Sequence, residues 1–301
     1  MSRDNCVWVV GSTPPPVGGV TVFIKYFREA SQIAGLERKV IFGPFSIKKA
    51  LTNNYSHVSI NVSNSFKRFF MLCFFKVIGK KAFFVKHGGV FDFHDPFVRG
   101  ACRIADGIFC LNSTVWTQLA EAGISSFLHT TVFQENAIAL SARYPEKNLK
   151  NGVLFYINNS RVIDGVEIYG ASFFAQAMKN ANYKGRITII DLSNQYRDLF
   201  RPMPNVVYRS EPVDFCELLS EHEIYIRCTA MDGMSVALLE AGLLGVKCLA
   251  SDAVPRPDFV RTYIHGDQDS FLQELNDLLK EEPTHTQFEA TSVTEVIDYI
   301  L

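Results

Sequence analysis

Short apolar runs of strand length alternate with longer segments of helical periodicity along most of this 301-residue chain. The run VWVV at residues 7–10, for example, is followed by apolar positions at helical spacing over residues 20–34 and then by KVIF at residues 39–42. Apolar runs of about four to eight residues are typical of strands buried on both faces of a sheet, and helices between them imply parallel pairing through crossover connections. The pattern therefore predicts an α/β fold built from doubly wound parallel sheets.

A polar segment at residues 145–151 interrupts the alternation, which restarts at VLFYI, residues 153–157. The length of the chain suits two domains of about 150 residues each. We therefore expect two Rossmann-like domains, residues 1–147 and 148–301, that face a central cleft, with the last helix either in the second domain or returning to the first. Ligands of such sheets bind at the carboxyl ends of strands, so candidate site residues are those that directly follow a strand.

The composition argues against several classes of protein. The 30 basic and 31 acidic residues leave a formal charge of −1, which provides no overall field for binding a nucleic acid. The seven cysteines are odd in number, scattered and never in a Cys-x-x-Cys spacing, which disfavours a disulfide framework or a zinc site. The first apolar run is too short for a signal peptide. We therefore expect a cytoplasmic protein.

The longest apolar stretch, FKRFFMLCFFKVIGKKAFF at residues 66–84, is interrupted by basic residues. It falls short of the roughly 20 apolar residues that a membrane span requires. Two interpretations of the predicted helix Phe66–Ile78 remain. It is either buried between a sheet and its neighbours, or it lies on a membrane surface, where aromatic residues beside lysines are typical. The second interpretation implies peripheral contact with the inner face of a membrane.

Two glycine-containing segments of the first half follow predicted strands. In GSTPPPVGGV, Gly18 and Gly19 precede a helix whose free amides would attract a phosphate or a hydroxyl-rich group, unless the loop is only a structural turn. In AFFVKHGG, His87 ends a strand and is followed by Gly88 and Gly89. This is the position from which a substrate-contacting side chain would project, although a lone histidine is often structural.

The strongest signal is IYIRCTAMDGMSVALLEAGLLGVKCLAS at residues 224–251, which predicts a strand, a polar loop, a helix and a second strand. Ser235 is suited to cap the helix, and the amides of its first turn would form a pocket for the diphosphate of a nucleotide. Glu240 lies about one and a half turns inside an apolar helix, where ribose hydroxyls are natural partners. The alternative for Glu240 is an outward-facing charge.

Two arginines flank this loop in the predicted sheet. Arg227 ends the preceding strand, and Arg256 follows the next one in AVPRP. Both guanidinium groups are expected at the same sheet edge, where they would offset phosphate charge.

Together these segments resemble the retaining glycosyltransferases of family 4, which have the GT-B fold and carry an acidic-x7-Glu motif. The motif stands here as Asp232 to Glu240 and is followed by AGLLGVKCLASD. PPPVGGV, HGG and ADGIFCLNSTVWTQL are similar to family segments and occur in the expected order over most of the chain. The form RCTAMDGMSVALLEAG, with SDAVPRP after it, resembles the branch that builds bacterial surface polysaccharides.

The resemblance implies roles for the second half of the chain. Glu240 would bind the ribose of the donor, and Asp232 would contact the donor sugar and its departing diphosphate. The backbone amides around Gly233, Met234 and Ser235 would hold the donor.

For the first half, the resemblance implies that His87 touches the donor sugar near its anomeric centre, while Gly18 and Gly19 approach the phosphates or the acceptor. The resemblance also implies that the enzyme works without a metal. No cofactor is expected. The donor would be a nucleotide sugar, UDP- or GDP-linked, and the acceptor a glycan or a lipid-linked molecule.

The sequence departs from the family in the segment FYINNSRVIDGVEIYG. Asn158-Asn159 and Asp164-Gly165 stand where the family has Gly-Arg and Lys-Gly, so both usual phosphate-binding cations are missing. Arg161 lies between these positions and is the candidate replacement. The family also often has Glu at the position of Asp232.

Three functions follow from these observations. The first is glycosyl transfer with retention, in which helix amides and guanidinium groups stabilise the leaving diphosphate. The second is a non-catalytic partner protein of the same fold with weakened donor binding, which the missing cations favour. The third, a sugar-nucleotide epimerase, lacks both a tyrosine–lysine pair and a dinucleotide loop in this sequence.

Overall fold

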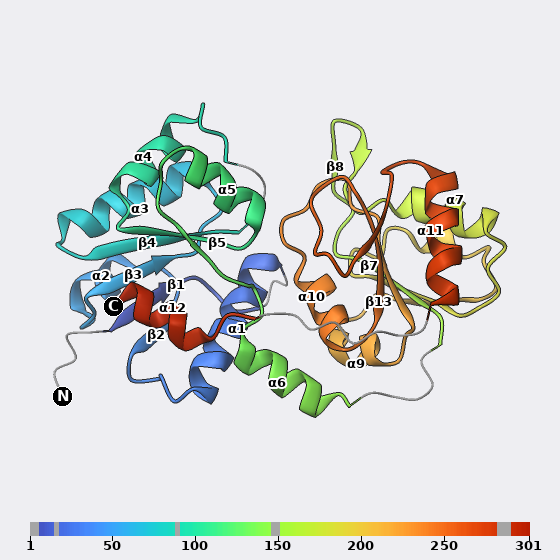
Figure 1. Cartoon of the computed structure of the whole chain (residues 1–301), viewed down its shortest axis with the longest axis horizontal. Coiled ribbons are helices and arrows are strands. Elements are labelled where there is room, and N and C mark those ends of the chain that lie inside the picture. Colours follow the sequence, from blue (N-terminus) through green and yellow to red (C-terminus); the bar gives the residue numbers. More distant parts are fainter. Residues whose placement is uncertain (1–5, 15–17, 88–90, 146–150, 282–289) are drawn as a thin grey trace. The chain divides into compact units, whose positions relative to one another are not determined.

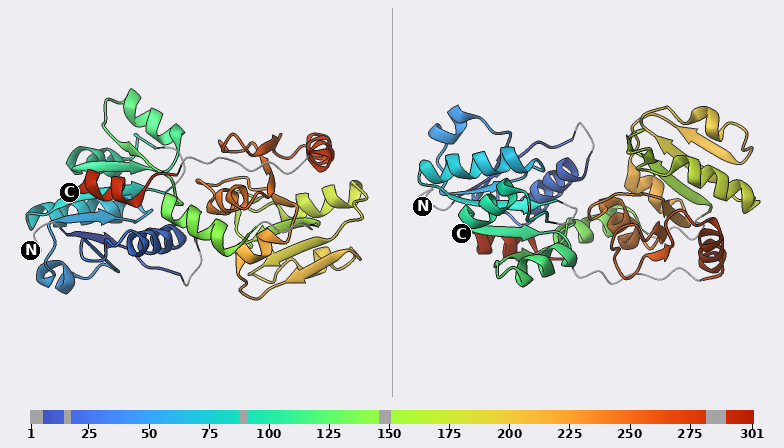
Figure 2. Two further views of the ribbon diagram at one scale, coloured as in Figure 1. Left: turned by 60° about the horizontal axis from the view of Figure 1, so that its bottom comes forward. Right: turned by 90° about the horizontal axis from the view of Figure 1, so that it is seen from above.

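The computed structural model describes residues 6–14, 18–87, 91–145, 151–281 and 290–301. The chain divides into two compact units: the first comprises Met1–Ile138 and Glu289–Leu301, and the second Ala139–Phe288. The boundary predicted after residue 147 falls outside the described residues, and the two units divide between Ile138 and Ala139, inside the helix α6 (Gln134–Arg143). The last helix, α12 (Val293–Ile300), belongs to the first unit (Figures 1 and 2).

The first unit contains a six-stranded parallel sheet with the order β2-β1-β3-β4-β5-β6. Its strands are β1 (Val7–Val10), β2 (Val40–Gly43), β3 (His57–Ile60), β4 (Lys81–Lys86), β5 (Gly107–Cys110) and β6 (Phe127–Leu128). The apolar runs of the sequence form these strands because helices cover both faces of the sheet.

The helices of the first unit are divided between the two faces of its sheet. They are α1 (Gly19–Ile33), α2 (Ile47–Thr52), α3 (Ser65–Val77), α4 (Pro96–Ile104), α5 (Ser113–Glu121) and α12, with α6 at the unit's boundary. Trp8 and Phe84 share a buried cluster with residues of α2 to α5. On the other face of the sheet, Phe109 of β5 contacts Tyr299 of α12, with ring centroids 5.3 Å apart.

The second unit contains another six-stranded parallel sheet, with the order β11-β10-β7-β12-β13-β14. Its strands are β7 (Val153–Ile157), β10 (Ile187–Asp191), β11 (Val206–Arg209), β12 (Ile224–Arg227), β13 (Lys247–Ser251) and β14 (Arg261–Tyr263). Two further short strands, β8 (Val162–Ile163) and β9 (Val166–Glu167), form a separate antiparallel hairpin.

Helices also cover both faces of the second sheet. They are α7 (Ala171–Asn180), α8 (Arg197–Phe200), α9 (Phe215–Ser220), α10 (Val236–Leu243) and α11 (Gln268–Lys280). Phe155 of β7 stacks on Phe174 of α7 with centroids 4.0 Å apart, in the cluster that includes α11. The neighbouring Leu154 faces the opposite way, toward Leu238 of α10 and the residues of α9. The prediction of an α/β fold with two doubly wound sheets is confirmed.

Helix α3 confirms the predicted helix in the apolar stretch, and it packs both on its sheet and against Phe97 of α4. Leu72 and Phe75 lie in the core, whereas Phe66 and Phe70 are about half exposed, at 52% and 50%. The interpretation of a helix that packs between the sheet and its neighbours therefore holds in part, because α3 contacts both the sheet and α4 while its outer face stays exposed. Within the described residues, no helix combines the length and apolar character needed to cross a bilayer.

Candidate functional site

The loop between β12 and α10 lies at the carboxyl edge of the second sheet. Arg227, the last residue of β12, pairs in register with Ala250 of β13, so the segments that follow the two strands start side by side. Parallel neighbours bring sequence-distant residues to one edge in this way. Residues 228–235, which we call the 228–235 loop, therefore meet the segment that begins at Ser251.

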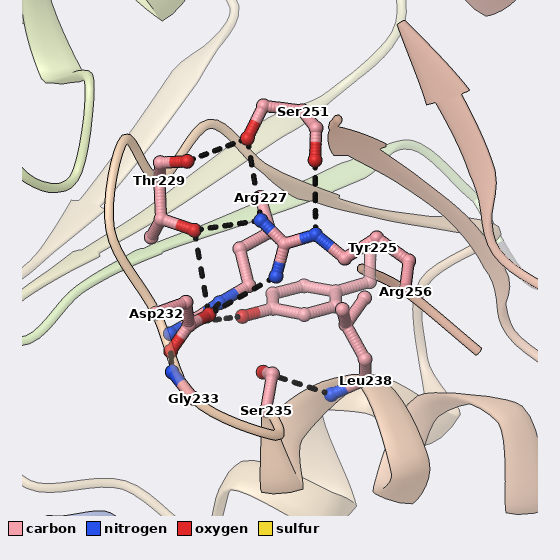
Figure 3. Close-up of polar contacts among 9 residues, drawn as sticks. All are labelled: Tyr225, Arg227, Thr229, Asp232, Gly233, Ser235, Leu238, Ser251 and Arg256. Carbon is pink, nitrogen blue, oxygen red and sulfur yellow. Dashed lines mark hydrogen bonds and ion pairs between the residues drawn. The ribbon is translucent and has the colours of Figure 1, made fainter. Parts of the chain in front are cut away.

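The carboxylate of Asp232 is the centre of this loop (Figure 3). Its Oδ2 accepts a hydrogen bond from Arg227 Nε at 2.6 Å, another from Arg256 Nη1 at 3.2 Å, and a third from Thr229 Oγ1 at 3.3 Å. Its Oδ1 accepts from the backbone N–H of Gly233 at 3.0 Å. One side chain thus holds two guanidinium groups and the backbone that leads into α10.

Arg256 links the loop to β13. Its Nε donates to the carbonyl oxygen of Ser251 at 2.9 Å, and its Nη2 donates to Thr229 Oγ1 at 2.9 Å and to Ser251 Oγ at 3.2 Å. Ser251 Oγ in turn donates to the carbonyl oxygen of Thr229. On the other side of the carboxylate, Arg227 Nη1 donates to the hydroxyl of Tyr225 at 3.2 Å. The planar forks of both arginines fix the loop at several points.

The cluster of Arg227, Asp232 and Arg256 carries two positive charges and one negative charge. Burial opposes ionisation of Asp232, but the nearby charges of Arg227 and Arg256 outweigh it and keep the pKa of this carboxyl below its usual range. Burial also opposes the charge of Arg227, yet Asp232 raises the pKa of this guanidinium overall. The pKa of Arg256 is lowered by burial and by Arg227, although Asp232 counteracts both. Asp232 therefore compensates one arginine, and the cluster retains a net positive charge.

Helix α10 starts where the 228–235 loop ends. Ser235 is its N-cap, and its Oγ accepts a hydrogen bond from Leu238 N at 3.4 Å, as the sequence predicts. The first amides of any helix have no acceptor within the helix. Glu240 is 7% exposed, so the interpretation of Glu240 as an outward-facing charge is wrong. Its charge acts on Tyr156 of β7, whose pKa is raised chiefly by burial.

The β8–β9 hairpin explains the departure from the family pattern at residues 158–165. Asp164 has φ 49° and Gly165 has φ 79°, the left-handed pair of a two-residue type I′ turn. The positions that would carry a phosphate-binding Lys-Gly thus form the tip of a hairpin. Arg161 is exposed at the start of this hairpin, where its backbone N–H donates to Asn159 Oδ1 at 3.0 Å.

The chain after this hairpin packs against the 228–235 loop. The N–H of Ala230 donates to the carbonyl oxygen of Ile168 at 2.9 Å, and the guanidinium of Arg227 lies 5.9 Å from the centre of the Tyr169 ring. Gly170 has φ 63°, and a Cβ there would lie 2.4 Å from the carbonyl oxygen of Cys228. Gly170 is therefore required both by its backbone angle and by this close approach.

The remaining candidate residues belong to the first unit. Gly18 is the N-cap of α1, and its N–H donates to Thr21 Oγ1 at 3.0 Å, while a Cβ on Gly19 would meet no atom within 4 Å. His87 directly follows β4, as predicted, and its Nε2 lies 3.0 Å from Asn61 Oδ1. Burial lowers the pKa of His87 to about 3, so the ring is neutral near pH 7. The glycines of HGG that follow His87 lie outside the described residues.

The structure thus brings together five of the residues predicted for the donor site. Arg227, Asp232, Gly233, Met234 and Ser235 all belong to the end of β12 and the 228–235 loop, and Glu240 follows in α10. The sequence interpretation missed Thr229 and Ser251, although Thr229 lies just after a predicted strand and Ser251 ends one. It also missed the hairpin, for which Asp164-Gly165 between the apolar residues Ile163 and Val166 is a strong local signal.

No protein-family model and no curated protein matches the sequence. Solved structures do match over almost the whole chain. A structure of Anabaena HepE in complex with UDP has a TM-score of 0.64 at 11% identity and covers 98% of this chain and 95% of its own.

Two further structures match over a similar extent. The lipopolysaccharide outer core galactosyltransferase WaaB has a TM-score of 0.58 at 16% identity, covering 98% of this chain and 94% of its own. The E. coli trehalose-6-phosphate protein bound with UDP-2-fluoro glucose has a TM-score of 0.61 at 11% identity, covering 98% and 95%. With its two six-stranded parallel sheets, this chain has the GT-B fold of such glycosyltransferases.

Proposed function

We propose that the chain is a glycosyltransferase that binds the diphosphate of a nucleotide-sugar donor at the 228–235 loop. The observation that carries this proposal is the buried cluster in which Arg227 and Arg256 converge on the single carboxylate of Asp232. A net positive charge with restricted access to water attracts an anion more strongly than the same charge on the surface.

The two arginines would act on the diphosphate mainly through their field and by fixing the loop. Nε, Nη1 and Nη2 of Arg256 already donate hydrogen bonds within the protein, as do Nε and Nη1 of Arg227. Direct hydrogen bonds would come from the amides at the start of α10, where the helix dipole also favours negative charge. This arrangement requires neither of the cations that are missing at residues 158–165.

Asp232 is accordingly proposed to organise the loop, in addition to the contact with the donor sugar that the sequence resemblance implies. Glu240 would bind the ribose hydroxyls. Its buried position in α10, which begins at the same loop, supports this assignment. His87 of the first unit would approach the donor sugar as a neutral ring, able to accept or donate a hydrogen bond but not to add charge.

The finer assignment is transfer with retention of anomeric configuration and without a metal, as the resemblance to family 4 implies. In this reaction the bond between the anomeric carbon and the diphosphate oxygen breaks, and the diphosphate leaves with the bonding electrons. The acceptor oxygen forms the new bond to the anomeric carbon, and its proton passes to the leaving phosphate oxygen. The field of the arginines and the α10 amides would stabilise the leaving oxygen. The UDP in the HepE complex supports a uridine donor, and WaaB supports a surface-glycan acceptor, either free or lipid-linked.

The test is calorimetry of the full chain with UDP, GDP and uridine, followed by a panel of nucleotide sugars. Arg256→Met should weaken binding of the diphosphate by about tenfold, roughly 1.4 kcal/mol, and leave uridine binding unchanged. Glu240→Ala should weaken both, whereas the exposed control Glu211→Ala should weaken neither. Failure of every UDP-, GDP-, ADP- and dTDP-sugar to bind would exclude the proposal.

The alternative is a non-catalytic protein of the same fold with weak donor binding. The hairpin turn at Asp164-Gly165 favours it, since this turn carries no cation at the position where the family has Lys-Gly. The absence of any heat or thermal shift with UDP and GDP would favour this alternative. Transfer of sugar from any donor to any acceptor would exclude it.

A further inference from the structure

The charges of the sequence are strongly segregated. Ten of the 30 basic residues and none of the 31 acidic residues lie between Arg38 and Phe91. The rest of the chain therefore carries 20 basic and 31 acidic residues. Although the overall charge is near zero, the first unit therefore contains a basic segment. This segment spans β2 to β4 and includes α2 and α3.

Helix α3 exposes large apolar side chains along one stripe. Phe66, Phe70 and Val77 are 52%, 50% and 86% exposed, and spacings of four and seven residues place them on the same face of the helix. The same helix buries Arg68, whose guanidinium lies 4.8 Å from the centre of the Phe84 ring. Phenylalanine is usually buried and arginine usually exposed, and this helix shows the opposite at these positions. Its outer face is therefore suited to bind an apolar partner.

The apolar surface continues beyond α3. In α2, Ile47 and Leu51 are exposed and four residues apart. The half-exposed ring of Phe45, just before α2, makes an edge-on contact with Phe74 of α3, with centroids 5.7 Å apart. Figure 1 shows both helices in the first unit. The segment that leads into α2 therefore packs on α3 through aromatic rings.

Lysines lie among these apolar side chains. Lys48 and Lys49 are exposed next to Ile47, and Lys67 is exposed next to Phe66. Among the described residues none of the three has an ion-pair partner, unlike Lys76, which pairs with Asp106 at 2.7 Å. Their positive charge is thus available to an external anionic partner.

We infer that this face docks on the surface of a lipid bilayer that contains anionic lipids. We define the basic–apolar face by its eight side chains: Ile47, Lys48, Lys49, Leu51, Phe66, Lys67, Phe70 and Val77. The apolar side chains enter the interface between headgroups and acyl chains, while the lysines contact lipid phosphates. A nucleic acid would satisfy the lysines but would leave Leu51 and Val77 in water. This docking does not rest on the proposed function and does not require nucleotide binding.

The experiment is sedimentation of the full-length protein with vesicles of phosphatidylcholine alone or mixed with phosphatidylglycerol. The wild type should bind the anionic vesicles, and its affinity should fall as salt is raised. Two double variants test the face: one combines Phe66→Ser and Phe70→Ser, and the other combines Lys48→Glu and Lys49→Glu. Each should raise the lipid concentration for half-maximal binding by about tenfold or more. UDP binding by the same proteins should be close to that of the wild type, and circular dichroism should show that each variant is folded at the temperature of the assay.

Matched controls come from the second unit. Val207→Ser with Ile264→Ser removes two exposed apolar side chains, and Lys179→Glu with Lys184→Glu reverses two exposed charges. Both controls should sediment like the wild type. Three outcomes would each overturn the inference. The wild type could bind neutral and anionic vesicles equally, or either double variant of the basic–apolar face could bind as the wild type does. The wild type could also bind single-stranded RNA but not vesicles. Free phosphate should not reduce vesicle binding when the ionic strength is held constant, because the site is a surface and not a phosphate pocket.

Discussion

Arg227 and Asp232 form the shortest ion pair of the 228–235 loop, with 2.6 Å between Nε and Oδ2, and both side chains are largely buried. Arg256 reaches the same oxygen at 3.2 Å. Because one carboxylate compensates two buried guanidinium groups, the ionised form of Asp232 stabilises the loop. The same surplus of positive charge makes the loop a suitable place for a diphosphate.

Asp232→Asn should reduce the free energy of unfolding by about 3 kcal/mol, because it leaves two buried guanidinium groups without a counter-charge. Urea unfolding followed by circular dichroism measures this difference. The control is Asp198→Asn, which removes one partner of an exposed pair with Arg201 and should change stability by less than about 0.5 kcal/mol. Equal stability of the two variants would show that Asp232 is not the organising charge.

The stabilisation by Asp232 should depend on pH. The pKa of this carboxyl is lowered in the folded state, whereas an unfolded aspartate titrates near about 3.9. The contribution is therefore complete above that value and is lost as the pH falls through the lower folded pKa. The difference in unfolding free energy between the wild type and Asp232→Asn should stay constant above about pH 5 and shrink below about pH 4. A difference that grows on acidification would contradict the assignment.

Gly170→Ala should be more destabilising than Gly165→Ala. Both glycines have positive φ, so each substitution carries a backbone cost of about 1 kcal/mol. Only at position 170 does the new Cβ meet the carbonyl oxygen of Cys228, at 2.4 Å, which adds overpacking of about 1–3 kcal/mol. Thermal unfolding of both variants provides the comparison. Gly170→Ala should also weaken UDP binding, because its clash displaces the start of the 228–235 loop.

The ring of His87 should remain neutral through the physiological pH range. Its pKa is lowered to about 3, first by burial and then by the positive charges of neighbouring groups. In NMR spectra assigned with the His87→Gln variant, the ring protons of His87 should not shift between about pH 8 and pH 5. A titration near the unperturbed pKa of about 6.5 would show instead that the ring is open to water.

Much of the site was accessible from sequence because its signals are local. Ser235 precedes an apolar helical segment and caps α10, and Glu240 lies inside that helix. The Asp164-Gly165 turn was also a local signal, but it was interpreted through the family pattern and so the hairpin was missed. The partners of Arg227 could not be predicted, since a guanidinium at a sheet edge fits a phosphate and a carboxylate equally well.

The sequence by itself determined the alternation of strands and helices, because burial on both faces of a parallel sheet requires continuous apolar runs and covering helices with an apolar side. Only the tertiary structure decided which distant segments meet. The parallel register of β12 and β13 brings Arg256 to Asp232, and the return of α12 completes the first unit. It also decided that Phe66 and Phe70 stay about half exposed, because α3 packs on its sheet and on Phe97 of α4, and these contacts cover only part of the two rings.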